Sequence, residues 1–329
     1  MKKKTSILLM LCTVLALICV VPQAQAAVKL SKKTLVVTKG KTATLKVNGT
    51  KKKAVWSSSN KKIATVTQKG VVSGKKAGTA KITAKIGKKK YTCAVTVTPK
   101  VTYNTYKHKY FTASIPKGWK VEIGLMGTNP LLVDLVSYGI RVYDPKNTDR
   151  CVYLCLNAVC VKSEAAHERQ VLYYNWGMGS KSLADAPVVS EAKTKTFFKA
   201  MESFYGMQSF SVSKNLGKAV SGGDILLANA KSKASGKKVQ GIFTAYVSPE
   251  TTGDFVSIYS IVIERARSSE FAYYQPILDH VLSSIKFTKA FQDDRAAAWE
   301  DAMGTAAEAQ ANGDAISSMI MKAWNKQMQ

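Results

Sequence analysis

The sequence predicts a multidomain chain: an all-β sandwich comes first, an α+β domain with a mainly antiparallel sheet follows, and a helical tail ends it. Two patterns support this. Short alternating apolar runs between Gly-centred turns fill the first hundred residues, as in an antiparallel sandwich. Beyond them, strands give way to helical segments, further strands and a closing helix, the order of an α+β domain. A length of 329 residues leaves room for both cores.

Residues 1–26 have the features of a secretory signal peptide. Lys2–Lys4 precede an apolar run over Ile7–Val21, and a small-residue site ends at Ala26. The run is shorter than the roughly 20 residues that span a membrane. A lipoprotein would use Cys19, but Ile18 stands where that motif needs a small residue. We therefore expect a secreted mature chain that begins at residue 27.

The first domain is expected over residues 27–98. Trp56 is the predicted core anchor, because an indole can fill much of a small sandwich. The last hairpin alternates apolar and polar residues on both strands and turns over Gly87–Lys90. The expected strands are Leu35–Thr38, Thr42–Val47, Ala54–Ser58, Ile63–Thr67, Val71–Ser73, Thr79–Ile86 and Tyr91–Thr98.

This stretch resembles the group 2 bacterial Ig-like domain (Big_2, invasin/intimin-like) over about residues 28–98. The likeness is carried by a Trp-led turn and by small residues between strands: Trp56, Ser58, Ser59, Asn60, Ile63, Ala64, Val66, Gly70, Val72, Gly78, Ile82 and Ala84. The resemblance implies a β-sandwich that spaces or attaches other domains at a bacterial surface. It implies no ligand, and we expect no cofactor.

Charge divides the chain sharply. The first acidic residue is Glu122, and the residues before it include 27 lysines and no arginine. The rest holds 22 basic and 21 acidic residues, so nearly all of the net charge of +28 belongs to the amino-terminal part. Such a field attracts polyanions over long range and weakens as salt rises.

An Ig-like strand order would gather lysines at the two ends of the sandwich. The candidate polyanion-binding residues lie at one end: Lys51, Lys52, Lys53, Lys69, Lys88, Lys89 and Lys90. The other end would hold Lys39, Lys41, Lys61, Lys62, Lys75 and Lys76. Two interpretations stay open. Exposed lysines keep sheet edges apart and the protein soluble, or they bind an anionic cell-wall polymer or acidic glycan. Nucleic acid fits less well, because this stretch has no arginine, little aromatic interleaving and no recognition helix.

Residues 99–109 are interpreted as a linker, residues 110–289 as the α+β domain and residues 290–329 as the tail. The expected strands are 111–115, Lys120–Ile123, Leu131–Tyr143, Cys151–Val161, Asp224–Ser232, Lys238–Val247 and Phe255–Ile263. The expected helices run from the N-cap Ser163 through Trp176, over Glu191–Tyr205 and over about Ser269–Ser284.

The opening FTASIPKGW and the closing FAYYQPILDHVLSSIKF of this domain resemble the Mog1/PsbP-like group of secreted α/β/α sandwiches. That resemblance covers residues 110–289. Members of the group mostly bind or scaffold, and the likeness assigns no catalytic residue.

The cysteines are expected to be buried thiols. Cys151 and Cys155 lie four apart on one strand, which separates their Cα atoms by about 13 Å. A disulfide needs less than about 7 Å. Cys160 has the opposite parity and is expected on the other side of the sheet. Cys93 lies in the first domain, and a zinc site would need paired ligands that this sequence does not supply.

The three histidines offer little chemistry. His167 follows Cys155 and Cys160, but a nucleophilic pair must be adjacent in the fold, and an exposed helix residue is the plainer interpretation. We expect His280 to pack on its helix and His108 to be solvated. The sequence thus favours a secreted, surface-associated, non-catalytic protein. The alternatives are a secreted hydrolase of wall or host glycan, with its site in the α+β domain, or a purely structural envelope component.

Overall fold

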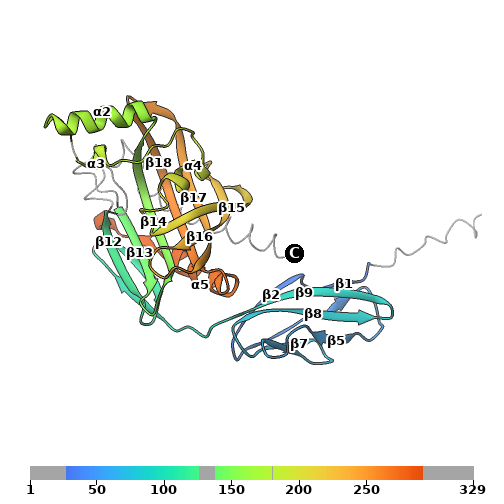
Figure 1. Ribbon diagram of the computed structural model, residues 1–329. Helices are drawn as coiled ribbons and strands as arrows, with labels where there is room; N and C mark the ends of the chain where they lie inside the picture. The colour runs from blue at the N-terminus through green and yellow to red at the C-terminus, as the bar shows by residue number, and fades with distance from the viewer. Residues whose placement is uncertain (1–26, 126–137, 180, 292–329) are drawn as a thin grey trace, which may run out of the picture.

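The computed structural model describes residues 27–125, 138–179 and 181–291 (Figure 1). The expected signal peptide lies outside these ranges, and so does the tail apart from residues 290 and 291. Within the described ranges, no helix has both the length and the apolar character needed to cross a bilayer.

The amino-terminal sandwich, residues 27–98, has two main layers. A four-stranded sheet has the order β2-β9-β8-β5, a three-stranded sheet has the order β3-β7-β6, and β1 pairs with β4. The strand positions follow the sequence pattern, although the predicted strand Thr42–Val47 is split in two. The strands are β1 Lys29–Leu30, β2 Thr34–Thr38, β3 Thr42–Thr44, β4 Val47–Asn48, β5 Val55–Ser58, β6 Ala64–Val66, β7 Val71–Gly74, β8 Gly78–Ile86 and β9 Lys89–Thr98.

Trp56 anchors the core of this sandwich, as predicted, and is only 8% exposed. Gly70 lies against its ring: a Cβ there would come within 3.0 Å of Trp56 Cζ2 and 2.3 Å of the Leu45 carbonyl oxygen. The φ of Gly70 is +78°, a conformation that side chains with a Cβ resist. Glycine at this turn is therefore what lets the indole and the turn pack together.

The α+β domain is built on a seven-stranded antiparallel sheet of order β12-β13-β14-β18-β17-β16-β15. A smaller sheet has the order β10-β11-β19. The strands are β10 Tyr103–Lys107, β11 Phe111–Pro116, β12 Lys120–Leu125, β13 Tyr138–Asp144, β14 Asn147–Val161, β15 Met207–Lys218, β16 Asp224–Ser232, β17 Lys238–Thr252, β18 Phe255–Arg267 and β19 Lys286–Phe287. The helices are α2 Glu164–Asn175, α3 Lys181–Ala184, α4 Thr194–Ala200 and α5 Phe271–Ser283.

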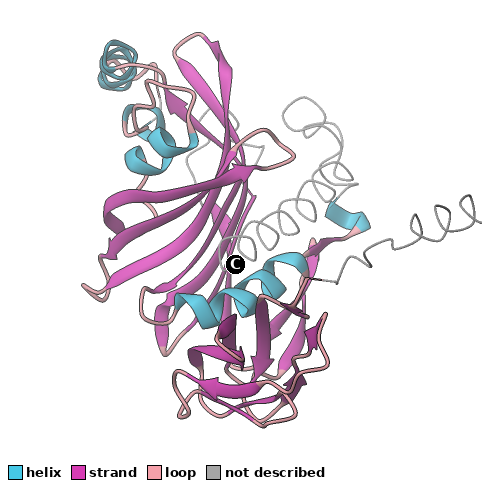
Figure 2. Cartoon of the chain, turned by 90° about the vertical axis from the view of Figure 1, so that its right-hand side faces the viewer, coloured by secondary structure: helices cyan, strands magenta, loops and turns pink. Residues whose placement is uncertain are grey.

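Each face of the large sheet has its own core. α5 and β11 cover one face through Phe111, Phe271 and Leu278. α4 covers the other through Phe197 and Phe198. Figure 2 shows α5 lying between the large sheet and the amino-terminal sandwich, and its residues contact β8 and β9 as well as β14 and β18. The predicted fold class, a sandwich followed by an α+β domain, is confirmed.

Three elements correct the sequence interpretation. Tyr103–Lys107 was expected in a linker but forms β10 and pairs with β11. Four of its five residues are exposed, so no apolar period marks it. Met207–Lys218 forms β15, which the sequence analysis did not predict: this edge strand is mostly exposed and its register shifts three times. The helix expected over Glu191–Tyr205 is also shorter, because α4 spans only Thr194–Ala200.

The cysteine side chains are free and buried, as expected. The expected side for Cys160 was wrong, because it shares a core with Cys151 and Cys155. The alternation of β14 changes between Cys155 and Ala158, where the strand runs beside Ser260 of β18. Ser260 has a left-handed φ of +52°, so the backbone of β18 departs from regular strand geometry at this point.

Candidate functional site

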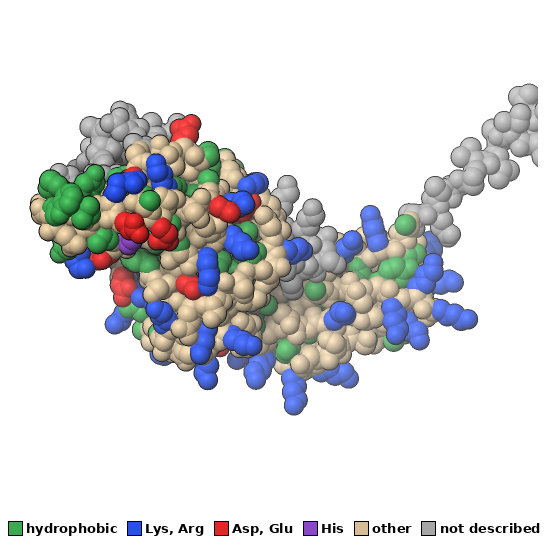
Figure 3. Space-filling view, turned by 45° about the horizontal axis from the view of Figure 1, so that its top comes forward, with side chains coloured by type: hydrophobic (Ala, Val, Ile, Leu, Met, Phe, Trp, Pro, Cys, Tyr) green, Lys and Arg blue, Asp and Glu red, His purple; other side chains and the backbone are tan. Residues whose placement is uncertain are grey.

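The surface of the amino-terminal sandwich carries charge of one sign only. Residues 27–98 include 19 lysines and no Asp, Glu or Arg. Every one of these lysines is exposed. Figure 3 shows Lys and Arg side chains spread over the sandwich, with Asp and Glu side chains gathered on the α+β domain. Because the sandwich has no acidic residue of its own, its lysines repel one another without compensation inside the domain.

Turns and strand ends bring the seven predicted lysines to the end of the sandwich that points away from the α+β domain (Figure 1). Lys88–Lys90 lie at the β8–β9 hairpin, whose two-residue turn is tighter than expected because Ile86 pairs with Lys89. Lys51–Lys53 precede β5, and Val55 pairs with Lys85 near that hairpin. This group is called the distal lysines below.

Lys69 joins the distal lysines through its neighbour Gln68. The Gln68 side chain accepts a hydrogen bond from Trp56 N at 3.3 Å and donates one to Trp56 O at 3.4 Å. These bonds hold the turn that carries Lys69 beside the first residues of β5. All seven side chains are exposed, so their ammonium groups can reach a ligand in solution.

Lys85 adds a feature that the sequence analysis missed. It lies directly opposite Lys90 on the outer face of the β8–β9 ladder, and both residues are exposed. Like charges facing each other across an antiparallel pair destabilise it by about 0.2–1 kcal/mol. A lysine in an alternating strand looks ordinary in the sequence, so only the register reveals the pair. An anion bound between the two ammonium groups would relieve the repulsion.

The remaining end of the sandwich holds six more lysines next to the domain junction. Gly40 N donates to Gly74 O at 2.9 Å, and Lys75 N donates to Ile63 O at 2.7 Å, so three turns meet there. They carry the proximal lysines: Lys39, Lys41, Lys61, Lys62, Lys75 and Lys76. Lys39 N donates to Thr98 O, which ties this group to the last residue of β9.

A pocket of about 370 Å³ opens where the proximal lysines meet the α+β domain. Basic side chains from both domains and two tyrosines of α5 line it. Its lining is Lys39, Lys76, Ala77, Pro99, Lys100, Arg150, Tyr273 and Tyr274. The residues come from distant parts of the chain, so no local motif could have predicted the pocket.

Arg150 supports this pocket but is already paired. Its guanidinium donates to both oxygens of Glu270 at 2.9 and 2.8 Å and to Asp144 Oδ2 at 2.8 Å. Burial opposes the charge of Arg150, but the hydrogen bonds to Glu270 and Asp144 outweigh it and raise the pKa of the guanidinium. The ring of Tyr274 lies 4.1 Å from the guanidinium. The cluster fixes the start of α5, and the lysines remain the cations available to a ligand.

The cysteines and histidines that the hydrolase alternative would use have structural surroundings. Burial raises the pKa of Cys155 and of Cys160 to about 12, so both thiols are protonated at neutral pH. His167 Nδ1 lies 3.1 Å from the Ala186 carbonyl oxygen, and the ring is half-buried instead of exposed as expected. In the described ranges, no three His, Cys, Asp or Glu residues come together as a metal site.

The other two histidines also have structural contacts. The ring of His280 packs on Tyr103 at 4.2 Å, and its Nε2 lies 3.0 Å from Ser114 Oγ. Its contact surface with Tyr103 desolvates the imidazole enough to lower its pKa, although His280 as a whole is exposed instead of partly buried as expected. His108 was expected to be solvated but is half-buried in a turn, where its Nδ1 accepts from Tyr110 N at 3.3 Å. The contacts of His280 join α5 to β10 and β11, and the bond of His108 closes the turn between these two strands.

Comparisons with known proteins support the description of the amino-terminal sandwich. The family model for the bacterial Ig-like domain (group 2) matches residues 24–97. The likeness of residues 110–289 to the Mog1/PsbP-like group stays a prediction. The chain matches none of the curated proteins.

Two solved structures of S-layer protein SbsC are distantly similar. A crystal structure of a long part of SbsC is 17% identical over 38% of this chain and 23% of the other, with a TM-score of 0.20. The structure of SbsC domains 5–6 is 14% identical over 71% of this chain and 95% of the other, with a TM-score of 0.21. This chain thus spans about a quarter of the first structure's length, and neither TM-score is high enough to bear on fold or function. The family match carries the assignment: the amino-terminal sandwich is a group 2 bacterial Ig-like domain.

Proposed function

We propose that this is a secreted, non-catalytic protein of the bacterial surface whose Ig-like sandwich holds it to an anionic polymer by charge and displays the α+β domain. The observation that carries the proposal is the set of 19 exposed lysines without any acidic residue in residues 27–98. The distal lysines are the primary contact. The family match supports the surface location, because such modules space or attach other domains there.

The arrangement of lysines favours a polymer over a small anion. β9 is ten residues long, so the two lysine groups lie roughly 30 Å apart along the sandwich. That separation exceeds the Debye length of about 8 Å at physiological salt, and each group therefore acts on its own section of a ligand. A polyanion that reaches both groups gains affinity from their linkage without any new contact.

The type of cation limits which class of polyanion fits this surface. Lysine carries a compact, mobile point charge, whereas arginine supplies a rigid fork for bidentate recognition. A surface made only of lysine suits a flexible chain of phosphates or carboxylates, such as a teichoic-type wall polymer or an acidic glycan. Residues 27–98 contain no arginine, and their two aromatic residues, Trp56 and Tyr91, are buried or half-buried, whereas nucleic-acid binding relies on exposed aromatic residues and arginine.

The test is co-sedimentation of the chain from residue 27 onward with purified cell walls before and after removal of teichoic-type polymer, with acidic mucin as a second probe. We expect binding at low salt, loss of binding when salt rises about tenfold, and weak binding to stripped walls. Replacing the seven distal lysines by Gln should reduce binding strongly. The matched control replaces six proximal lysines by Gln.

The outcomes separate the interpretations. Binding that falls equally in both variants would indicate a diffuse field and would remove the distal lysines as the primary contact. Failure of the wild-type chain to bind any anionic probe at low salt would refute electrostatic attachment. The same samples can be assayed for release of sugars or muropeptides from the wall, and release would favour the hydrolase alternative.

A further inference from the structure

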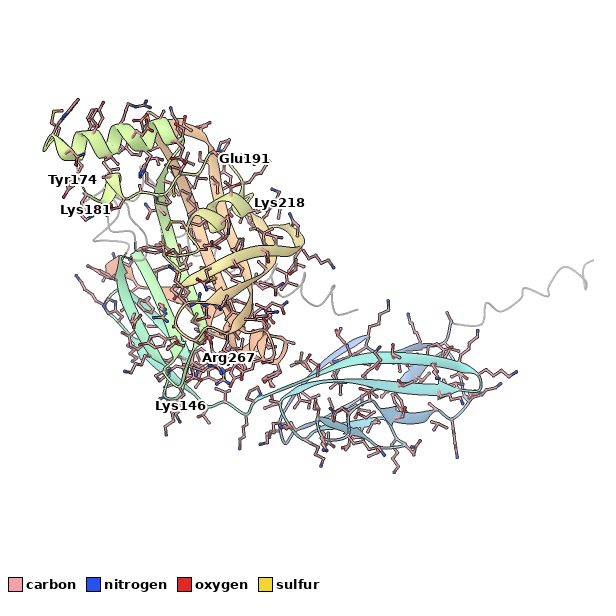
Figure 4. All side chains as sticks on the ribbon, in the orientation of Figure 1. Lys146, Tyr174, Lys181, Glu191, Lys218 and Arg267 are labelled. Atoms are coloured by element: carbon pink, nitrogen blue, oxygen red, sulfur yellow. The ribbon has the colours of Figure 1, made fainter. Side chains whose placement is uncertain are left out.

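Helix α2 presents an unusual group of large side chains to solvent. Only Ala166 and Gln170 of this helix are buried. Its outer end and the turn after it carry five exposed large hydrophobic residues, with exposed fractions of 42% for Leu172, 38% for Tyr173, 42% for Tyr174, 60% for Trp176 and 69% for Met178. Figure 4 labels Tyr174 at this end of α2, and Figure 3 shows hydrophobic side chains gathered there. These five residues are called the aromatic tip.

The backbone that carries the aromatic tip is fixed at the end of α2. Gly177 has a φ of +71°, and its N–H donates to Tyr174 O at 3.0 Å. Met178 N donates to Tyr173 O at 2.9 Å. This pair of bonds is a Schellman motif, which closes the helix and fixes the residues that follow. A ligand would therefore meet a backbone that is already ordered, so only the side chains would lose entropy on binding.

The charges around the tip argue against an anionic partner. Arg169 donates to both oxygens of Asp254, and Lys181 pairs with Asp185 at 2.8 Å. α2 also carries the exposed Glu168. The cations are thus compensated here, in contrast to the amino-terminal sandwich. An anionic lipid surface or polymer would find no excess positive charge.

The size of the tip argues against a stable protein dimer. With about 200 Å² for each large side chain, the exposed fractions leave roughly 500 Å² accessible. A standard interface buries about 800 Å² on each partner. Patches of roughly 300–600 Å² are the largest on typical monomers and are often functional. The tip is the right size for a ligand of a few rings.

We propose that the aromatic tip binds neutral polysaccharide. Pyranose rings have flat C–H faces that pack on tyrosine and tryptophan rings, and hydroxyl groups at their edges that need polar partners. Tyr173, Tyr174 and Trp176 supply the rings. Asn175 lies exposed between two of them, and its amide can both donate and accept hydrogen bonds. This site is separate from the lysine surface and does not depend on it.

The test is pull-down of the chain from residue 27 onward on insoluble neutral glycans: mannan, xylan, a glucan and chitin. About 0.5 M salt suppresses the lysine field in these assays. We expect retention on at least one glycan, and Trp176→Ala should weaken it about tenfold, while Trp176→Phe should restore most of it. Phe204→Ala is the matched control, because Phe204 is an exposed aromatic residue outside the tip. Circular dichroism checks that each variant is folded.

Two further measurements test other occupants of the tip. Flotation with uncharged phosphatidylcholine vesicles tests a lipid surface, and sedimentation equilibrium tests self-association. The proposal is overturned if no glycan retains the chain or if Trp176→Ala leaves retention unchanged. It is also overturned if Trp176→Ala instead abolishes vesicle binding or dimerisation. Loss of glycan binding in Trp176→Ala with salt-sensitive wall binding intact would show that the two sites are independent.

Discussion

Replacing Glu264 by Gln should make the α+β domain less sensitive to rising pH. Glu264 is completely buried on β18, where it pairs with Val152 of β14 and Ile242 of β17. α5 packs above it, with Gln275 Nε2 3.4 Å from Glu264 Oε2. Burial first, and then the charge of Asp279, raises the pKa of Glu264 well above its ordinary value. The folded state therefore holds this proton more tightly than the unfolded chain.

The direction of the pH dependence follows from the linkage between proton binding and folding. A carboxyl group with a raised pKa in the folded state contributes stability below its unfolded pKa of about 4.3, and this contribution is lost as pH rises toward the folded pKa. One proton changes the free energy of unfolding by at most about 1.4 kcal/mol per pH unit. Between pH 5 and pH 7 the loss is therefore at most roughly 2.7 kcal/mol. For a domain of this size, that corresponds to a fall in melting temperature of roughly 5–11 °C.

The assay is thermal unfolding by circular dichroism at pH 5, 6 and 7. Gln at position 264 cannot ionise and keeps an amide that can bond Gln275, so the variant should lose less stability than wild type over this interval. Glu250→Gln, at an exposed position, is the control and should behave as wild type. The reasoning is refuted if wild type and Glu264→Gln show the same pH dependence, or if wild type becomes more stable from pH 5 to pH 7 while the variant does not.

Three further predictions concern packing and surface charge. Gly70→Ala should cost about 1–3 kcal/mol in urea unfolding, because the new Cβ meets the Leu45 carbonyl oxygen at positive φ; an unchanged midpoint would contradict the packing argument. Lys85→Thr should raise stability by about 0.2–1 kcal/mol by ending its repulsion with Lys90, and should weaken polyanion binding in the same preparation. Cys155, whose pKa burial raises to about 12, should react with a thiol reagent at pH 8 only after denaturant is added; rapid labelling of the native protein would show that the core is open there.

Local signals explain which elements the sequence predicted well. Ser163 caps α2 by accepting a hydrogen bond from Ala166 N at 3.2 Å, and Gly177 follows the helix end, so both boundaries were visible in the chain. β16 was predicted with its observed bounds, Asp224–Ser232, because most of its residues are buried. β10 and β15 were missed because their residues are largely exposed and show no apolar period.

The candidate sites also divide into one that local sequence marks and others that only tertiary contacts form. The distal lysines were visible because charge is a property of composition, and turn residues placed them at strand ends. The pocket at the domain junction joins Lys39 to Arg150 and Tyr273, which meet only through tertiary structure. The face of Cys160 was wrong because period two assumes a regular ladder, and the ladder is irregular beside Ser260.

The short path between the two domains has a mechanical consequence. β9 ends at Thr98 and β10 begins at Tyr103, so the connecting residues span at most about 14 Å. A tensile force applied to the distal lysines would run along β9, which lies between β2 and β8, and load those ladders in shear. The force would then enter β10 and the β10–β11 ladder with almost no slack. A pull on the polymer would therefore be transmitted to the α+β domain of an attached molecule almost without delay.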